Sequence, residues 1–259
     1  MSAPEIHGSV AEGFEPVRDR FAAHFALPEA YREIGASLAV YRRGECVVDL
    51  WGGHADRART RAWQRDTLVN LWSTTKGVTA MAVALLVDRG ALRYEDRVAG
   101  FWPEFAAAGK SGVTVAHILS HQAGLPGFAE PLCLDDLYDQ ALCADRLARQ
   151  APLWDPGTAN GYHSITYGVL AADRADLVIG FNPQWGMGVL SNGSGALGPV
   201  PTAFGHGGWG GSVGCADRGT GIAIGYAPNH MGPELVGDPR PTGLCTAVFD
   251  CVREAAASG

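Results

Sequence analysis

Apolar residues recur along this chain with two periods, one typical of helices and one typical of strands. Residues 14–25 carry them at helical spacing, which predicts a helix after a short polar lead. Residues 36–41 and 46–51 are rich in β-formers and are joined by a tight polar turn that contains Gly44, so they predict an antiparallel hairpin. Three further strands are predicted at residues 184–191, 209–216 and 221–226.

The middle of the chain and its end carry helical patterns instead. After Ser73, apolar residues recur at intervals of three and four and predict an amphipathic helix that Gly90 ends. Two shorter helices are predicted at residues 113–120 and 134–149. A last helix closes the chain, with Pro241 in its first turn. The apolar stripe of the Ser73 helix is Val78, Met81, Ala82, Leu85 and Leu86, and that of the last helix is Leu244, Val248, Cys251 and Val252.

This order of elements predicts an α+β fold, with an antiparallel β-sheet flanked by N- and C-terminal helices and a reduced helical region. We assign residues 1–66 and 181–259 to the sheet region and residues 67–180 to the helical region, intertwined as a single catalytic unit. The 259 residues, of which 47% are hydrophobic, are enough to bury a substantial core.

Composition and charge narrow the range of partners. The formal net charge is −7, and the basic residues are scattered, so we expect neither nucleic acid nor a membrane as a partner. The N-terminus has no basic start followed by an apolar stretch, which favours a cytoplasmic protein. The cysteines show no C-x-x-C spacing, so we expect reduced, packed thiols rather than disulfides or a zinc site. They are Cys46, Cys133, Cys143, Cys215, Cys245 and Cys251.

The strongest candidate for chemistry is the pair Ser73 and Lys76, at the start of a predicted helix. Side chains three residues apart stand on the same helical face, so Lys76 can reach the Ser73 hydroxyl. The N-terminal end of a helix also favours negative charge that develops there. A serine N-cap followed by a solvent-facing lysine has the same pattern, so this motif alone does not establish a nucleophile.

Two further motifs follow in order, Tyr162-x-Ser164 and His206-Gly207-Gly208. Together with Ser73-x-x-Lys76, they make the chain resemble the serine β-lactamase and penicillin-binding-protein superfamily. Within it, the chain is most similar to class C β-lactamases and family VIII carboxylesterases. The likeness covers nearly the whole chain, because it extends through residues 49–53, 119–125 and 221–229.

The resemblance implies that Ser73 is the nucleophile and that Tyr162 is the base, assisted by Lys76. A serine hydroxyl is a poor nucleophile until a neighbour takes its proton. Lysine and tyrosine both have reference pKa values of about 10. A buried ammonium beside a phenol favours the phenolate and so lowers the pKa of the tyrosine, whereas desolvation disfavours the ammonium and so lowers the pKa of the lysine. The pair would titrate as a unit, and either residue could hold the proton.

The glycine-rich motif would supply the second half of the site. Gly207 and Gly208 let a backbone edge approach the substrate, and the N–H groups of Ser73 and Trp209 match the oxyanion hole of the family. The Trp209 indole would form a pocket wall.

His206 and Ser164 are departures from the lactamase pattern. Lactamases commonly carry a lysine at the position of His206, which helps to hold the substrate carboxylate, so a neutral histidine favours uncharged esters over β-lactams. The alternative is a strand-edge histidine with no role. Ser164 stands where lactamases commonly have asparagine, and its hydroxyl can hydrogen-bond to Lys76 or to the substrate.

Two other patterns compete as active sites. Ser212 lies in a G-x-S-x-G sequence, but a strand follows it rather than the helix that a nucleophile elbow needs, so we expect Ser212→Ala to keep its activity. His117 and His121 have zinc-protease spacing, but Ile118 stands where the glutamate base would be, and no third ligand is apparent. We expect His121 to hold a loop near the site, with no metal and no cofactor bound.

The segment between Tyr162 and His206 is short compared with that of relatives in the superfamily, and residues 171–176 stand where a long helix is expected. The leading hypothesis is a serine hydrolase that cleaves small or short-chain esters. The alternatives are β-lactamase or D-Ala-D-Ala peptidase activity, acyl transfer, or a weakly active or non-catalytic binding protein of the same fold. An opened pocket would expose apolar surface and favour a homodimer.

Overall fold

The computed structural model describes residues 4–133, 135–168, 185–186, 188–234 and 237–257. The chain divides into two compact units. The sheet unit contains Met1–Thr75 and Ser191–Gly259, and the helical unit contains Lys76–Leu190. The boundary between them falls within the first turn of helix α2 (Thr74–Asp88).

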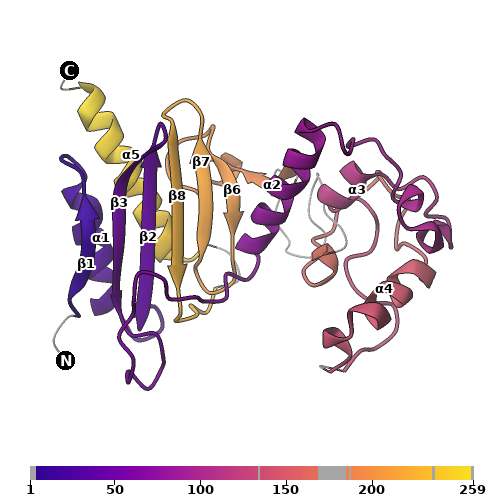
Figure 1. Cartoon of the computed structure of the whole chain (residues 1–259), viewed down its shortest axis with the longest axis horizontal. Helices are drawn as coiled ribbons and strands as arrows, with labels where there is room; N and C mark the ends of the chain where they lie inside the picture. Colours follow the sequence, from indigo (N-terminus) through magenta and orange to yellow (C-terminus); the bar gives the residue numbers. More distant parts are fainter. Residues whose placement is uncertain (1–3, 134, 169–184, 187, 235–236, 258–259) are drawn as a thin grey trace. The chain divides into compact units, whose positions relative to one another are not determined.

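The sheet unit is built on antiparallel strands in the order β1-β3-β2-β8-β7-β6 (Figure 1). The predicted hairpin is confirmed, and its two-residue turn has positive φ angles of 51° at Arg43 and 90° at Gly44. Such angles match the right-handed twist of the flanking strands. The strands are β1 (Ile6–Val10), β2 (Gly35–Arg42), β3 (Glu45–Gly53), β6 (Phe204–Gly207), β7 (Val213–Asp217) and β8 (Ile222–Pro228).

Strand β1 corrects the sequence-based prediction, which treated these residues as a polar lead. The strand pairs with β3 through the register Gly8↔Leu50, and it is largely exposed at the edge of the sheet. An edge strand with a glycine and polar residues lacks the apolar alternation that identifies a half-buried strand. Backbone pairing with β3 therefore places these residues in the sheet.

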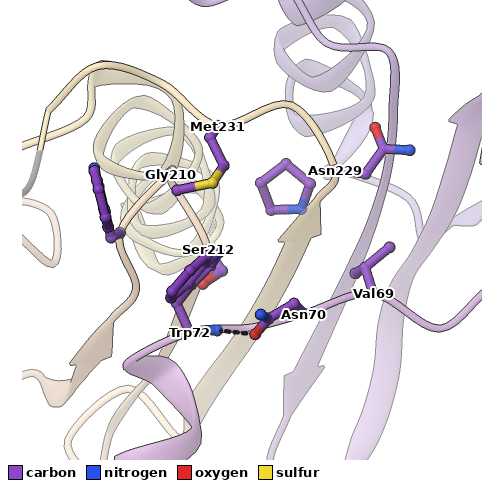
Figure 2. Close-up of a pocket in the computed structure, with 9 residues that line it drawn as sticks. Val69, Asn70, Trp72, Gly210, Ser212, Asn229 and Met231 are labelled. Atoms are coloured by element: carbon purple, nitrogen blue, oxygen red, sulfur yellow. Dashed lines mark hydrogen bonds between the residues drawn. The ribbon is translucent and has the colours of Figure 1, made fainter. Parts of the chain in front are cut away.

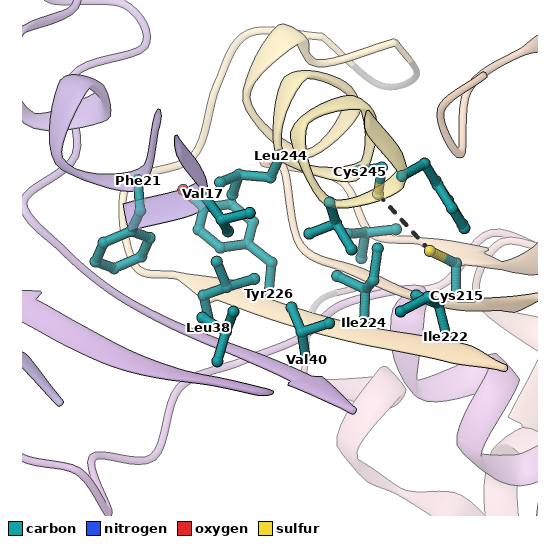
Figure 3. Close-up of a cluster of buried hydrophobic side chains, with 14 of the residues drawn as sticks. Val17, Phe21, Leu38, Val40, Cys215, Ile222, Ile224, Tyr226, Leu244 and Cys245 are labelled. Atoms are coloured by element: carbon teal, nitrogen blue, oxygen red, sulfur yellow. Dashed lines mark hydrogen bonds between the residues drawn. The ribbon is translucent and has the colours of Figure 1, made fainter. Parts of the chain in front are cut away.

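The terminal helices of the sheet unit are confirmed. Helix α1 (Glu15–Ala23) continues into a 3₁₀ turn at His24–Ala26, and helix α5 (Pro239–Ala257) closes the chain. Both helices pack on one face of the sheet and share one hydrophobic core with it (Figure 3). Leu38 and Ile224 face this core because alternate residues of a strand point to the same side. Each large aliphatic side chain buried there contributes about 1.5–3 kcal/mol.

The helical unit differs in detail from the sequence-based prediction. Helix α3 (Val115–Leu119) lies within the predicted range and begins with a capping box between Thr114 and His117. The helix predicted over residues 134–149 is shorter, because Asp139 caps α4 (Gln140–Arg149) by accepting a hydrogen bond from the Leu142 N–H. The single strand predicted over residues 184–191 is instead an antiparallel pair, β4 (Trp185–Gly186) and β5 (Val189–Ser191).

Helix α2 has the predicted position but not the predicted buried face. Met81 is 63% exposed and Val78 is 51% exposed, whereas Lys76 and Ala80 are buried and Val83 packs on a small cluster with Leu119. The helix carries apolar residues on nearly every face, so intervals of three and four fit more than one stripe. The pattern identified the helix but could not choose its inner side.

The fold is α+β, with an antiparallel sheet covered by the terminal helices, as the sequence predicted. Within the described part of the chain, no helix has both the length and the apolar character needed to cross a membrane.

Candidate active site

Ser73 lies directly before α2, at the end of a segment with an unusual backbone. Trp72 has a φ angle of +48°, which is uncommon for a residue with a bulky side chain. The Asn70 side chain stabilises this conformation, since its Oδ1 accepts a hydrogen bond from the Trp72 N–H at 2.8 Å. Such strain costs on the order of 1–3 kcal/mol and concentrates at functional sites. Here it lies next to the predicted nucleophile.

The glycine-rich motif forms a turn between β6 and β7. His206 and Gly207 belong to β6, whereas Gly208 to Ser212 make the turn and Val213 begins β7. The strand predicted over residues 209–216 therefore begins later than expected. Gly210 and Gly211 have φ angles of 92° and 102°, which only glycine adopts without strain, so the sequence bends here instead of continuing as a strand.

Ser212 fastens this turn to the segment that precedes Ser73. Its Oγ donates a hydrogen bond to the Leu71 carbonyl oxygen at 2.7 Å and lies 2.9 Å from Thr74 Oγ1. Its backbone carbonyl oxygen accepts a hydrogen bond from the Gly208 N–H at 2.8 Å. A Cβ atom added to Gly208 would lie 2.2 Å from Ser212 Oγ and 2.3 Å from the Leu71 oxygen. Only glycine fits at this junction.

The rings of Trp72 and Trp209 lie beside this junction, with centroids 5.7 Å apart. The sheet unit therefore brings the residue before Ser73 together with the residue whose N–H matches the predicted oxyanion hole. The His206 side chain is buried, and its Nδ1 lies 2.6 Å from the Gly207 carbonyl oxygen. This ring contacts its own strand, and its predicted part in substrate choice stays a prediction.

Lys76 is a predicted catalytic residue whose side chain is buried. It lies in the first turn of α2 and is only 9% exposed. Its Nζ lies 5.1 Å from the ring centroid of Tyr162 and 5.3 Å from that of Tyr167. Burial lowers the pKa of Lys76 to about 8, because the charged amine loses solvation. An amine with this pKa is partly neutral near pH 8 and can accept a proton.

Tyr162 and Ser164 lie in the helical unit with Lys76. The Lys76 amine donates a hydrogen bond to the backbone carbonyl oxygen of Ser164 at 2.8 Å, and the predicted role of the Ser164 hydroxyl stays a prediction. The Ser164 side chain is exposed. The Tyr162 side chain is buried, and the edge of the His121 ring packs against it at 4.9 Å between centroids.

Three further residues support this half of the site. His121 Nδ1 accepts a hydrogen bond from the His163 N–H at 3.1 Å, and His163 Nε2 accepts one from the Leu125 N–H at 3.2 Å. Burial lowers the pKa of His163 to about 3, so the ring is neutral and can accept. Tyr167 lies with its hydroxyl 3.5 Å from the Lys76 carbonyl oxygen.

His121 was predicted to hold a loop near the site, and the hydrogen bond that its Nδ1 accepts from the His163 N–H agrees with this prediction. The sequence did not single out His163 or Tyr167, and their nearness to Tyr162 along the chain was the only indication that it offered.

The competing patterns have structural explanations. Ser212 is buried, and its hydroxyl is engaged with Leu71 and Thr74, so it is not placed as a nucleophile. The same bonds change our expectation for Ser212→Ala, because the hydroxyl fastens the turn. His117 serves in the capping box of α3. In the residues that the model describes, no group of three or more histidine, cysteine or acidic side chains is arranged to hold a metal.

The predicted replacement of a long helix at residues 171–176 lies outside the described residues. The shortness of the segment between Tyr162 and His206 is therefore a property of the sequence, and the structure adds nothing to it.

Comparisons with known proteins show the family and the fold of this chain. A family model described as Beta-lactamase matches residues 19–175. The chain is 42% identical over 175 residues to "Esterase/beta-lactamase LipL" of Mycobacterium tuberculosis (strain ATCC 25618 / H37Rv), covering 68% of this chain and 40% of that protein. It is 40% identical over 98 residues to "Esterase EstB" of Burkholderia gladioli, covering 36% of this chain and 25% of that protein. The chain thus matches less than half the length of these relatives.

Two solved structures resemble the fold over most of this chain. One is a family VIII carboxylesterase, with a TM-score of 0.88, 33% identity and coverage of 95% of this chain and 100% of that chain. The other is a penicillin-binding protein homolog from Caulobacter crescentus, with a TM-score of 0.87, 30% identity and the same coverage of the two chains.

Proposed function

This chain belongs to the beta-lactamase family, and from that premise we propose that it is a serine hydrolase that cleaves small or short-chain carboxylic esters through an acyl-enzyme on Ser73. The observation that carries the proposal is the buried Lys76 amine. It has a pKa of about 8, lies in the helical turn that follows Ser73, and lies against the Tyr162 ring. A surface lysine after an ordinary serine cap would share the position but would have neither the lowered pKa nor the contact with the Tyr162 ring.

In the proposed first step, the Ser73 hydroxyl oxygen attacks the carbonyl carbon of the ester while the Tyr162 and Lys76 pair takes its proton. The carbonyl oxygen becomes an oxyanion, to which the N–H groups of Ser73 and Trp209 donate hydrogen bonds. The carbon–oxygen bond to the alcohol then breaks, and the alcohol oxygen takes the proton from the pair. The acyl group remains on Ser73 Oγ.

The second step reverses the proton movements with water as the nucleophile. The pair takes a proton from water, the hydroxyl oxygen attacks the acyl carbon, and Ser73 leaves with the returned proton. An acceptor alcohol in place of water would give acyl transfer through the same chemistry. Nothing in the geometry favours acyl transfer over hydrolysis.

Esters are favoured over β-lactams as substrates by the residues around the glycine-rich turn. A β-lactam carries a carboxylate, and His206 replaces the lysine that commonly holds it in lactamases. The His206 ring is also buried against its own strand. The names of the relatives described above include both esterases and a β-lactamase, so the substrate is tested directly.

A fluorophosphonate probe tests the nucleophile. We expect the intact mass of the protein to increase by one adduct, which Ser73→Ala abolishes. Ser9→Ala, at an exposed position on β1, is the control and should label like the wild type. A folded wild-type protein that gains no adduct, or an adduct that persists in Ser73→Ala, would contradict the assignment and favour a non-catalytic protein.

Hydrolysis of p-nitrophenyl acetate and of a chromogenic cephalosporin, measured side by side, tests the substrate class. We expect the larger kcat/KM for the ester. Faster turnover of the cephalosporin would reverse our interpretation of His206.

A further inference from the structure

A pocket of about 300 Å³ opens in the sheet unit beside residues 69–73, which we call the nucleophile segment (Figure 2). One wall comes from the residues that precede Ser73, a second from the glycine-rich turn, and a third from the chain that follows β8. The lining residues are Val69, Asn70, Trp72, Trp209, Gly210, Ser212, Pro228, Asn229 and Met231.

The pocket offers an apolar surface. The part-exposed rings of Trp72 and Trp209, tilted at 57° to each other, form one side of it, and none of the lining residues is charged. The amide of Asn229 is engaged in the fold, since its Oδ1 accepts from the Gly35 N–H and its Nδ2 donates to the His54 carbonyl oxygen. A carboxylate in this pocket would meet no cation, whereas an uncharged apolar group would be well placed.

The shape of the pocket is fixed by the fold. Asn70 holds Trp72 in its left-handed conformation, and a Cβ atom on Gly210 would lie 2.8 Å from the Met231 side chain. Met231 and Gly210 therefore pack in direct contact. A pocket with walls held in this way selects its contents by shape as well as by polarity.

The position of the pocket indicates which side of the ester it contacts. Its lining includes the residue before Ser73 and also Trp209, so a group that enters it extends from the reacting carbonyl. In the proposed reaction the alcohol leaves in the first step, whereas the acyl group stays on Ser73 through both steps, with its carbonyl oxygen at the N–H groups of Ser73 and Trp209. A pocket bounded by the residue before Ser73 and by Trp209 therefore adjoins the part of the ester that remains on the protein, which is the acyl group.

We propose that this pocket binds the acyl side chain of the ester and selects acyl groups that carry a compact aromatic ring, such as phenylacetyl. The inference rests on the proposed acyl-enzyme reaction. A cavity of roughly 150 Å³ is sufficient for benzene, so a pocket of this size accommodates one ring and its linker. Contact with the indoles would add aromatic stacking to the burial of the ring.

The test is a ratio of specificity constants. For p-nitrophenyl phenylacetate and p-nitrophenyl acetate, which share a leaving group, kcat/KM reports steps up to acylation. Val69→Phe places extra volume in the pocket, and we expect it to lower the phenylacetate-to-acetate ratio by about tenfold or more. Leu68→Phe is the matched control, because the neighbouring Leu68 side chain is 95% exposed, and it should leave the ratio unchanged.

A second pair of substrates, benzyl acetate and ethyl acetate, varies the alcohol and keeps the acyl group constant. We expect Val69→Phe to leave this ratio as in the wild type. If Val69→Phe lowers the benzyl-to-ethyl ratio instead, the pocket takes the alcohol and the acyl assignment is wrong. If it changes neither ratio, the pocket is not part of the substrate site.

A binding measurement separates failure of this inference from failure of the proposed function. In Ser73→Ala, which cannot form the acyl-enzyme, methyl phenylacetate should change the tryptophan emission through Trp72 and Trp209. Adding Val69→Phe should weaken this binding about tenfold. Equal binding by both proteins would overturn the pocket assignment even if Ser73 labels with the fluorophosphonate. Lost labelling with intact pocket binding would overturn only the hydrolase.

Discussion

Lys76 combines a buried amine with a lowered pKa, and this makes the pH dependence of activity predictable. Below pH 8 the amine is mostly protonated, and above pH 8 it is mostly neutral, because burial has moved its pKa down from 10.5 to about 8. If the neutral amine helps to deprotonate Ser73, kcat/KM for p-nitrophenyl acetate should rise with pH and reach a plateau above an apparent pKa near 8. This value belongs to the coupled Lys76 and Tyr162 pair.

The variant Lys76→Arg checks the assignment, since a guanidinium stays protonated throughout this pH range. We expect kcat/KM to fall by roughly 10²–10⁴, the usual contribution of a positioned acid or base, and the rise near pH 8 to disappear. If kcat/KM of Lys76→Arg still rises near pH 8 as in the wild type, the rise belongs to the titration of another group.

Gly208 lies where the glycine-rich turn contacts the residues before Ser73, so a larger residue there should displace the turn or those residues. Gly208→Ala would force a Cβ atom to within 2.3 Å of the Leu71 carbonyl oxygen, so the turn or the nucleophile segment must move. A displacement of about 1 Å can cost roughly a hundredfold in rate, and we expect a loss of at least this size in kcat/KM. Gly225→Ala on β8, where an added Cβ meets nothing within 4 Å, is the control and should keep near wild-type activity.

Ser212→Ala tests the contact between the glycine-rich turn and Leu71 with a smaller change. It removes the hydrogen bond to Leu71 without adding bulk. One hydrogen bond contributes about 1 kcal/mol, so we expect kcat to fall by about fivefold with little change in KM or in Tm. Unchanged kcat would show that the turn is held without the hydroxyl. Complete loss of fluorophosphonate labelling at Ser73 would instead give Ser212 a larger part.

At the scale of elements, Arg240 fixes the start of α5. Its buried guanidinium donates to Glu33 Oε1 and to Asp238 Oδ2, each at 2.7 Å, and to the carbonyl oxygens of Gly210 and His230. Arg240→Met would leave two buried carboxylates without their cation. Breaking a buried ion pair in this way costs about 3–5 kcal/mol, and urea unfolding should show a loss of this size.

Arg253→Met is the matched control on the same helix. The Arg253 side chain is 71% exposed and pairs with Asp250, so its loss should change the free energy of unfolding by no more than about 1 kcal/mol. Equal effects of the two substitutions would contradict the anchoring of α5 by Arg240.

The elements show which parts of the fold were predictable. The hairpin and the terminal helices were found because local periodicity and turn chemistry agree there with the burial in the fold. The strand β1 and the inner face of α2 were not found, since one depends on pairing with β3 and the other on which of several apolar faces meets a neighbour. Those are tertiary facts that a local pattern does not contain.

The candidate site was also only partly predictable from the sequence. Ser73, Lys76 and Tyr162 could be proposed from motifs in order, because the proposed chemistry requires particular residue types. The hydrogen bond from Ser212 to Leu71 was not, because it joins residues far apart in the chain, and the G-x-S-x-G pattern suggested a different role for the serine. Likewise, the sequence did not predict that the backbone oxygen of Ser164 accepts a hydrogen bond from the Lys76 amine. Every residue type supplies a backbone carbonyl oxygen, so the sequence does not indicate which of them accepts a hydrogen bond.

At the scale of the whole molecule, composition led to the expectation of reduced thiols, and the model gives a pattern of reactivity to test. All six cysteines are free. Cys46 and Cys133 are exposed, and the remaining four are buried, with the Sγ atoms of Cys215 and Cys245 in contact at 3.7 Å. Burial raises the pKa of Cys251, and the pKa of Cys245 is raised well above its usual range by the Cys215 contact and by burial. Such thiols are poor nucleophiles at neutral pH.

We therefore expect iodoacetamide to add two groups quickly to the native protein and six to the protein unfolded in urea without a reductant, as measured by intact mass. The double variant Cys46→Ser/Cys133→Ser should add none in the native state and four after unfolding, which assigns the fast sites. Fewer than six adducts on the unfolded wild type would reveal a disulfide. Rapid modification of more than two sites in the native state would show that the native protein opens far more readily than the burial of the other four thiols implies.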